Sequence, residues 1–438
     1  MKILLTLLFL CTCCFALSLN NSYRYTYYNS SFYGTSGEQI AVDKQGHIII
    51  AGGLWSTRDG DRGPYIALWK FLPDGTLDKD WYNGYGFYTA RSADGKSKNH
   101  LSSFVLDSED YIYAVGDTDL ALTIWKLYGQ SIENQPTYSG LDYRFGQHGG
   151  AIFKFSDYIW SQAWKVRLDN SGNLIVYGGA LNKTSFQQDL MFWKFTKEGL
   201  LDTNWGTNGY ALINSIPKFS IQNFIIDPNG NFLLVGYDFR STADYDMIVQ
   251  RYNPSGMLNL TIRYHVDGYA FMGDDIVIDT NGNMYITGRI NTLNNFDDCK
   301  MIVWKYNTNG ILDTTFGNKG IGLYQVQNGQ YHYDHGRRMI LGNENKLYIA
   351  ANGNIPNMKH GSLVLWAITL DGLNSSWTSV IDDTTDIYPS NMVDYNNKIY
   401  MTGSYGKQSP EQGCLINGVY LCDWYTTSSD MGFWIFNK

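Results

Sequence analysis

One unit of sequence recurs along nearly the whole chain of 438 residues, and this repeat limits the possible folds more than any other feature. Each copy has an apolar strand, a turn rich in Gly, Asn or Asp, a second apolar strand ending in glycine, and then a third strand. Copies spaced about 60 residues apart indicate an architecture in which each copy is one supersecondary unit. The glycine of the second strand falls at Gly52, Gly116, Gly178, Gly236, Gly288 and Gly403, with Ala351 in the sixth copy.

The third strand and the segment after it identify the type of repeat. A glycine turn, a Leu-Asp motif and a fourth, aromatic-rich strand follow the third strand in most copies. Strands are short, turn residues recur every few positions, and no stretch keeps a helical period. Four strands in each of seven copies predict an all-β fold, a seven-bladed β-propeller of four-stranded antiparallel blades. The third strand is marked by Trp69, Trp125, Trp193, Trp304, Trp366 and Trp434, with Gln250 in the fourth copy.

The two ends of the chain predict how the ring closes. The segment SYRYTYYNSSF, which begins at Ser22, has the pattern of a fourth strand without its first three. The final MGFWIFNK has the pattern of a third strand without its fourth. We therefore expect a strand near Tyr23–Tyr28 to pair with the strand containing Trp434, which would leave no free sheet edge at the closure. Residues 19–438 would then form a single domain.

The repeats carry a family resemblance. The segments DPNGNFLLVG and MIVWKYNTNGILDTTFGNKGIGLY resemble the delta-60 repeat, a secreted β-propeller repeat. The resemblance is strongest over residues 189–213 and 301–324, and it covers nearly all of the chain after residue 18. The chain departs from the pattern in having Trp where the family usually has a small residue before Arg. The resemblance implies the propeller architecture and no particular activity.

The first eighteen residues predict a targeting segment. Lys2 precedes a short apolar run, and the small residues Ala16 and Ser18 suit signal-peptide cleavage, so we expect a secreted, extracellular protein. No later apolar run is long enough to span a membrane. Glycosylation sequons agree with this route and begin at Asn20, Asn29, Asn182, Asn259 and Asn374.

Three cysteines remain after a signal peptide is removed, and they cannot all pair with one another. Cys414 and Cys422 flank an Asn-Gly pair, which is a strong hairpin signal. A bulge or a three-residue turn would bring the two sulfurs opposite each other. We predict a disulfide between Cys414 and Cys422, with Cys299 left unpaired.

Charge and composition exclude some classes of partner. The formal net charge is −8, which disfavours binding to nucleic acid or an anionic membrane. No motif predicts a cofactor. Residues 279–283 faintly resemble a calcium loop, but Ile290 stands where the bidentate Glu would be, so we predict a β-turn and no metal.

Loop length separates the two faces of the predicted ring. The connections between strands one and two, and between three and four, are short and uniform. Those between strands two and three, and between repeats, are long and irregular, and rigid scaffolds usually carry binding residues on such loops. We call this second face the variable face. Its candidate ligand-binding residues are Trp55, Arg58, Asp59, Asp61, Arg62, Tyr237, Asp238, Arg240, Tyr245, Asp246, Arg289, Asp297 and Asp298.

A further candidate is the only histidine cluster, which contains His332, Asp334 and His335. Two histidines and an aspartate could bind zinc or form an acid–base pair, but the sequence offers no obvious third ligand. A general binding loop and an ordinary loop remain open as alternatives.

The lysines of the third strand follow a rule that predicts pairing. Where the strand has lysine, an aspartate follows in the Leu-Asp motif, as in Lys194 and Asp202. Where the lysine becomes Arg251, the aspartate becomes Asn259. A lysine between packed sheets needs a partner, so we expect structural ion pairs rather than an anion-binding ring.

These features favour a secreted, non-catalytic scaffold that binds an extracellular protein or glycan. The alternatives are a carbohydrate- or lactone-active hydrolase or lyase at the propeller mouth, and a purely structural matrix component. An enzyme would need acid–base residues converging from several blades.

Overall fold

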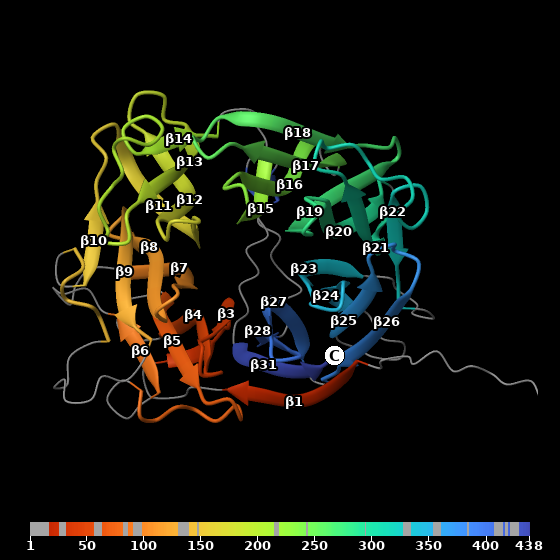
Figure 1. Cartoon of the computed structure of the whole chain (residues 1–438), viewed down its shortest axis with the longest axis horizontal. Helices are drawn as coiled ribbons and strands as arrows, with labels where there is room; N and C mark the ends of the chain where they lie inside the picture. Colours follow the sequence, from red (N-terminus) through yellow and green to blue (C-terminus); the bar gives the residue numbers. More distant parts are fainter. Residues whose placement is uncertain are drawn as a thin grey trace, which may run out of the picture.

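The computed structural model describes residues 17–25, 32–56, 64–81, 86–90, 99–129, 140–146, 149–213, 219–241, 244–293, 295–326, 334–353, 361–382, 385–406, 415–416, 419–420 and 429–438. Its regular elements are β-strands, which form seven antiparallel blades around one axis (Figure 1). The predicted seven-bladed β-propeller is confirmed. Within the described part of the chain, no helix is long and apolar enough to cross a membrane.

The first three blades follow one another along the chain. Blade 1 holds β2 (Phe32–Thr35), β3 (Gln39–Val42), β4 (Ile48–Ser56), β5 (Pro64–Phe71) and β6 (Phe87–Ala90), and both β2 and β3 pair with β4. Blade 2 holds β7 (Asn99–Leu106), β8 (Tyr111–Thr118), β9 (Ala121–Tyr128) and β10 (Gly150–Phe153). Blade 3 holds β11 (Tyr158–Leu168), β12 (Leu174–Asn182), β13 (Gln188–Phe195) and β14 (Tyr210–Leu212).

Blades 4 to 6 repeat the same order. Blade 4 holds β15 (Phe219–Ile226), β16 (Phe232–Ser241), β17 (Asp244–Tyr252) and β18 (Leu258–Tyr264). Blade 5 holds β19 (Tyr269–Ile278), β20 (Met284–Thr292), β21 (Asn295–Tyr306) and β22 (Ile321–Tyr324). Blade 6 holds β23 (His335–Leu341), β24 (Lys346–Gly353), β25 (Ser362–Thr369) and β26 (Ser375–Val380).

Blade 7 is built from both ends of the chain. It holds β27 (Asp386–Tyr395), β28 (Lys398–Gly406), β31 (Ser429–Asn437) and, at its outer edge, β1 (Ser18–Tyr25). Ser22 pairs with Trp434 and Tyr23 with Phe433, so the predicted closure is confirmed. A separate hairpin of β29 (Leu415–Ile416) and β30 (Val419–Tyr420) lies between β28 and β31 in the sequence.

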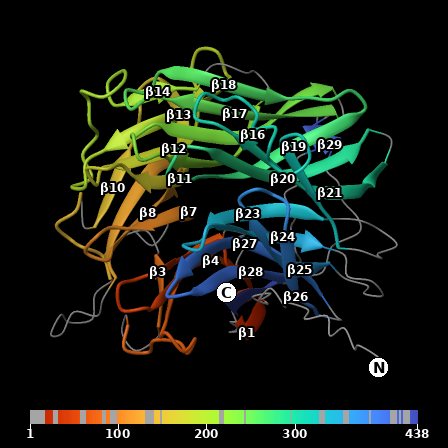
Figure 2. The same ribbon diagram turned by 45° about the vertical axis from the view of Figure 1, so that its right-hand side comes forward.

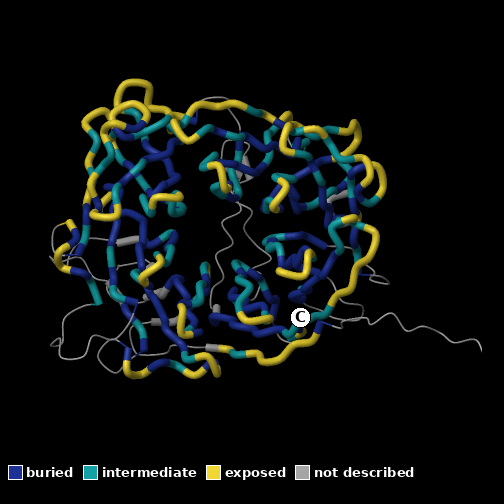
Figure 3. Tube along the Cα trace, in the orientation of Figure 1, coloured by how far each residue is buried: buried dark blue, intermediate teal, exposed yellow. Residues whose placement is uncertain are grey.

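The core lies between the blades. Buried stretches follow the strands of every blade, and exposed ones gather at the turns and the outer rim (Figure 3). The third-strand tryptophans fill the space between neighbouring blades, which pack face to face (Figure 2). Trp69, Trp193, Trp304 and Trp434 are completely buried. In blade 4 the buried Gln250 takes this place and accepts a hydrogen bond from Tyr252.

The first strand of each blade is the innermost, and its β-bulge explains the repeated glycine. In blade 5 the register shifts between Gly273 and Asp275, opposite Gly288. A Cβ on Gly288 would lie 1.8 Å from the Met272 carbonyl oxygen, which no real side chain permits. The same clash, at 2.0 Å, would arise between a Cβ on Gly178 and the Gln162 carbonyl. The glycine is therefore required for close approach of the backbone.

The turns between first and second strands also follow a rule. Asp279 Oδ1 accepts the backbone N–H groups of Asn281 and Asn283, both at 2.9 Å, so residues 279–283 form a capped β-turn as predicted. Asp43, Asp107, Asp169 and Asp227 cap the equivalent turns. Each turn has a residue with positive φ, as their composition predicted. These residues are Gly46, Asp110, Gly172, Gly230, Gly282, Asn345, Asn396 and Asn397.

The predicted lysine–aspartate pairs are present. Lys70, Lys126 and Lys194 lie 3.8, 3.7 and 3.7 Å from Asp78, Asp142 and Asp202. Lys305 lies 2.9 Å from Asp313. The Arg251 guanidinium donates to the Asn259 side chain at 3.1 Å, so the co-substituted pair keeps the contact without a second charge.

A ring of polar residues has one member from each blade, directly after the bulge in blades 2 to 7 and at the start of β3 in blade 1. We call it the axial ring. Most members hold the next blade. Gln39 accepts the Phe104 N–H at 3.1 Å, and Asp275 accepts the Met339 N–H at 2.8 Å. The ring consists of Gln39, Ser103, Lys165, Asn223, Asp275, Arg338 and Asn391.

Candidate functional site

The structure describes only part of the predicted binding residues. Trp55 lies in β4 opposite Pro64, and Asp297 and Asp298 lie in β21, with side chains that are not described. Several predictions fall outside the described residues, including residues 1–16 of the predicted eighteen-residue signal peptide. The others are Asn29, Arg58, Asp59, Asp61, Arg62, His332, Cys414 and Cys422.

The variable face differs from the prediction in one respect. Segments 180–188, 237–246 and 289–299 were expected to be irregular loops, but they are largely the ends of paired strands. In blade 4, β16 and β17 stay paired to Ser241 and Asp244. In blade 5, Asn291 still pairs with Cys299. The predicted residues of these segments therefore stand on rigid hairpins, whose side chains alternate between two faces.

The blade 4 hairpin carries aromatic residues on one of these faces. The rings of Tyr237, Phe239 and Tyr245 form a triangle with centroid separations of 5.1 to 5.4 Å. They follow Val235 and Met247, which pack on blade 5, so the triangle lies on the blade 5 side of the hairpin. All three side chains are half-buried, which leaves part of the aromatic surface open.

Charged residues from blades 5 and 6 adjoin this triangle. Tyr237 is close enough to Asp274 and Arg289 for both to act on its pKa, which burial raises. The Arg289 guanidinium lies 2.9 Å from the Met272 sulfur. At the start of β23, His335 Nε2 donates to the Asp274 carboxylate at 2.7 Å. The blade 4–6 site thus unites four predicted residues with three others. It is defined by Tyr237, Phe239, Tyr245, Asp274, Arg289, His335 and Arg337.

The histidine and aspartate of this site are a buried pair. Burial lowers the pKa of His335 to about 3 despite the neighbouring carboxylate, so the imidazole is neutral. Burial alone would raise the pKa of Asp274, but His335, Arg337 and Arg289 hold it below its usual range. Sequence analysis missed Asp274 because only the blade order brings it to His335.

Asp334 and Cys299 are buried next to the same site, because Asp334 precedes His335 and Arg289, Asp274 and Arg337 all act on the Cys299 thiol. Burial raises the pKa of Asp334 to about 7, against a hydrogen bond from the Val326 N–H at 3.1 Å. Cys299 is a free, buried thiol whose Sγ lies 3.4 Å from the Asp334 carbonyl oxygen. Burial raises its pKa to about 12, so it is an unreactive thiol. The prediction that Cys299 is unpaired is confirmed.

The other face of the blade 4 hairpin carries an ion-pair network. Arg263 bridges Asp238 at 2.7 Å and Asp246 at 2.6 Å. His265 lies 2.7 Å from Asp246, and Arg240 lies against the same imidazole. Predicted residues Asp238, Arg240 and Asp246 therefore belong to this network, on the side of the hairpin away from the blade 4–6 site.

The blade 4 network includes the one group of possible metal ligands among the described residues. Ligand atoms of Asp244, Asp246 and His265 lie within 4.8 Å of one another. Both ring nitrogens of His265 already face carboxylates, and two guanidinium groups neutralise the acids. Cations beside the carboxylates disfavour a metal ion there, so the group is best explained as an ion-pair network.

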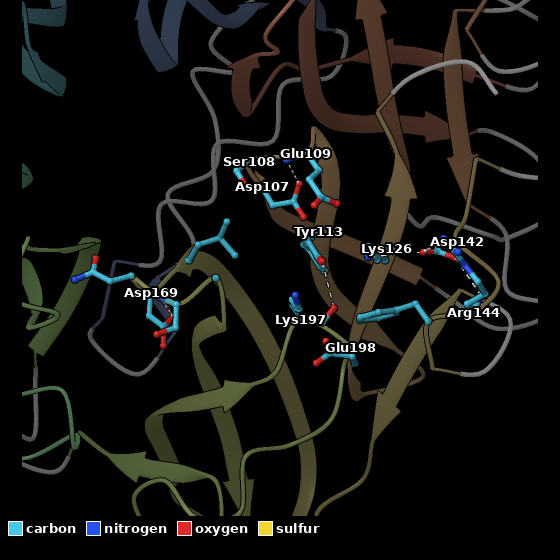
Figure 4. A pocket seen from close by; sticks show the side chains of 15 residues that line it. Asp107, Ser108, Glu109, Tyr113, Lys126, Asp142, Arg144, Asp169, Lys197 and Glu198 are labelled. Carbon is cyan, nitrogen blue, oxygen red and sulfur yellow. Dashed lines mark hydrogen bonds and ion pairs between the residues drawn. The ribbon is translucent and has the colours of Figure 1, made fainter. Parts of the chain in front are cut away.

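A cavity of about 580 Å³ lies on the opposite face of the molecule, between blades 2 and 3 (Figure 4). Its polar groups largely pair with one another: Tyr113 donates to the Lys197 carbonyl at 3.2 Å, and Arg144 lies 2.8 Å from Asp142. The cavity is formed by the short turns of the repeat and holds none of the predicted binding residues.

Comparison with known proteins identifies the fold and nothing finer. No model of a known protein family matches the sequence, and no curated protein matches it. A protein of unknown function from Dyadobacter fermentans has 9% identity and a TM-score of 0.50, over 96% of this chain and 99% of that one. An ulvan lyase, a polysaccharide lyase, has 11% identity and a TM-score of 0.48, over 86% and 93%. The Trypanosoma rangeli sialidase has 11% identity and a TM-score of 0.44, over 96% and 60%.

Proposed function

We propose that this protein is a secreted, non-catalytic scaffold whose blade 4–6 site binds an extracellular protein or glycan. The observation that carries the proposal is the aromatic triangle of Tyr237, Phe239 and Tyr245. Its side chains are only half-buried, and it lies beside Arg289. An apolar surface with a few fixed polar groups is the usual character of a binding site. The residues stand on rigid paired strands, which suits recognition without rearrangement.

Burial weighs against catalysis at this site. Asp334 has a pKa of about 7, which is in the range of a general acid, and His335 pairs with Asp274. This observation supports the alternative of a carbohydrate- or lactone-active hydrolase or lyase. However, Asp334 and His335 are only 1% and 2% exposed, so a substrate would not reach them without movement.

Export and glycosylation belong to the same proposal. Asn259 and Asn374 are exposed and open to modification. Asn182 is less suited, because it is half-buried and its Nδ2, the atom that would carry a glycan, donates to Asp189 at 3.4 Å. We expect glycans at Asn259 and Asn374 rather than at Asn182, and peptide mapping by mass spectrometry of protein from a eukaryotic culture medium would test this.

A glycan array and metal analysis of the secreted protein would test the proposed function. Phe239→Ser and Arg289→Met should each abolish binding of whatever ligand the wild type retains. Tyr143→Ser is a matched control, because Tyr143 is an aromatic residue 48% exposed on the opposite face. Turnover of a bound sugar would favour the enzyme alternative, and self-association without a ligand would favour a structural matrix role.

A further inference from the structure

Lys165 departs from the structural rule of the axial ring. Gln39, Ser103, Asn223, Asp275 and Arg338 all reach the neighbouring blade through hydrogen bonds. Among the described residues, the Lys165 ammonium makes no hydrogen bond and no ion pair within 4.0 Å. Lys165 therefore does not join neighbouring blades, as the other named members of the axial ring do.

Four charged groups lie close enough to Lys165 to act on it electrostatically. The groups that act on it are Arg167 on its own strand, Arg338 on β23, Asp275 on β19 and Glu38 between β2 and β3. We call these five residues the axial charge cluster. Burial lowers the pKa of Lys165 to about 7, and Arg338 and Arg167 act in the same direction.

The two arginines of the cluster donate their hydrogen bonds to neutral acceptors, and Asp275 acts on Arg167 only at longer range. Arg167 donates to the Val166 carbonyl at 2.9 Å and to Asn223 at 3.4 Å. Arg338 donates to the carbonyls of Ser390 and Arg337, both at 2.7 Å. All of these acceptors are neutral, and within the described chain neither guanidinium has a carboxylate inside 4.0 Å.

The acids of the cluster cannot neutralise it fully. Asp275 is already occupied, because it accepts Asn223 at 2.6 Å, Ile276 N–H at 2.9 Å and Met339 N–H at 2.8 Å. Glu38, the other acid, is exposed to water, so its attraction for Lys165 is screened by solvent.

We propose that Lys165, Arg167 and Arg338 form an anion-binding site on the propeller axis that takes a carboxylate or sulfate group. Arginine forks and a lysine ammonium are the donors that suit such oxygens. Lys165 and Arg338 occupy equivalent register positions of blades 3 and 6, and the three cations are close enough to act on one another electrostatically. The group arrives either as a free anion or as part of an acidic sugar. The site is separate from the blade 4–6 site, and its test needs no ligand of that site.

Titration calorimetry of the full secreted chain with sodium sulfate and with sodium glucuronate tests the site, at an ionic strength held constant with sodium chloride. Binding of sulfate identifies a free-anion site, and binding of glucuronate alone identifies an acidic-sugar site. Lys165→Met should weaken the binding about tenfold or more, since it removes a charged donor. Glu38→Gln should strengthen it, because the substitution removes a competing carboxylate.

Binding should also take up protons. An anion beside Lys165 raises its pKa from about 7, so the affinity should be higher at pH 6 than at pH 8. The exposed Lys154→Met serves as the control and should leave the affinity unchanged. Lys165→Gln provides a second variant that removes the charge and keeps a polar side chain. The proposal is wrong if neither anion binds, or if the Lys165 variants bind as well as the wild type.

Discussion

Lys70 is the most deeply buried of the paired third-strand lysines, with 2% of its surface exposed. Its ammonium donates to the Gly129 carbonyl at 2.7 Å and lies 3.5 Å from Asp43 and 3.8 Å from Asp78. Sequence alone identified the Asp78 contact but not Asp43, which comes from the first turn of the blade. Two carboxylates and a carbonyl thus compensate one buried charge.

Lys70→Met should lower the free energy of unfolding by roughly 3–5 kcal/mol, because it leaves buried carboxylates without their cation. Lys194→Met should cost only about 1 kcal/mol, since the Lys194 and Asp202 side chains are 19% and 28% exposed. Urea denaturation of both variants would compare them. Adding Asp78→Leu to Lys70→Met should recover part of the loss, and equal losses in the single and double variants would contradict the pairing.

Gly288→Ala should destabilise the protein by roughly 3 kcal/mol, because its Cβ would lie 1.8 Å from the Met272 carbonyl oxygen. Gly150→Ala is the matched control, since Gly150 lies in a strand and its nearest neighbour to a Cβ is 3.5 Å away. Thermal unfolding measures both. Equal melting temperatures would show that the close backbone contact at the bulge does not explain the glycine.

Lys165→Met should stabilise the fold near neutral pH. The pKa of Lys165 is about 7 in the folded protein and 10.5 ordinarily, so the unfolded chain binds the proton more tightly. The charged lysine therefore destabilises the fold fully below pH 7, and this cost fades as the pH rises to 10.5. Methionine should add roughly 1–2 kcal/mol at pH 6, allowing for water at the site. Unfolding at pH 6 and pH 10 would show a gain at the lower pH only.

At the scale of single elements, the sequence predicted strand order and turns well because both depend on neighbouring residues. Positive φ at Gly172 and pairing of Lys305 with Asp313 are of this kind. The sequence analysis did not predict that the blade 4 hairpin stays paired as far as Ser241 and Asp244. In this segment polar residues alternate with aromatic ones outside the apolar core, which is also the composition of a loop. The pair of His335 and Asp274 joins residues 61 positions apart, so it requires knowledge of blade packing.

The small β29–β30 hairpin gives the register of the strands between the two cysteines. Leu415 pairs with Tyr420 and Ile416 with Val419, so a bulge is needed to bring Cys422 opposite Cys414. We predict a disulfide between Cys414 and Cys422 that contributes roughly 2–3 kcal/mol by reducing the entropy of the unfolded chain. Non-reducing peptide mapping would detect it. A bridge from either cysteine to Cys299 would contradict both this prediction and the burial of Cys299.

At the scale of the whole molecule, stability depends on joining the two ends of the chain. β31 pairs with both β28 and β1, so it is the central link of the closing blade. Arg24 adds ion pairs to Asp430 at 2.6 Å and to Asp382 at 3.2 Å. Buried Leu17 packs into the same apolar cluster as Trp434. Blade 7 therefore seals the ring through contacts made by residues that are about 400 positions apart.

Deleting residues 431–438 should remove cooperativity, because β1 loses its partner and blade 7 loses Trp434 from its core. We expect a lower and broader thermal transition and a lower yield in the culture medium. Deleting residues 17–25 should have a smaller effect, since it removes only an edge strand. Arg24→Met is the mild control and should cost about 1 kcal/mol, because its side chain is 41% exposed. Unchanged melting after the 431–438 deletion would show that packing between the remaining blades, and not the joined ends, holds the ring together.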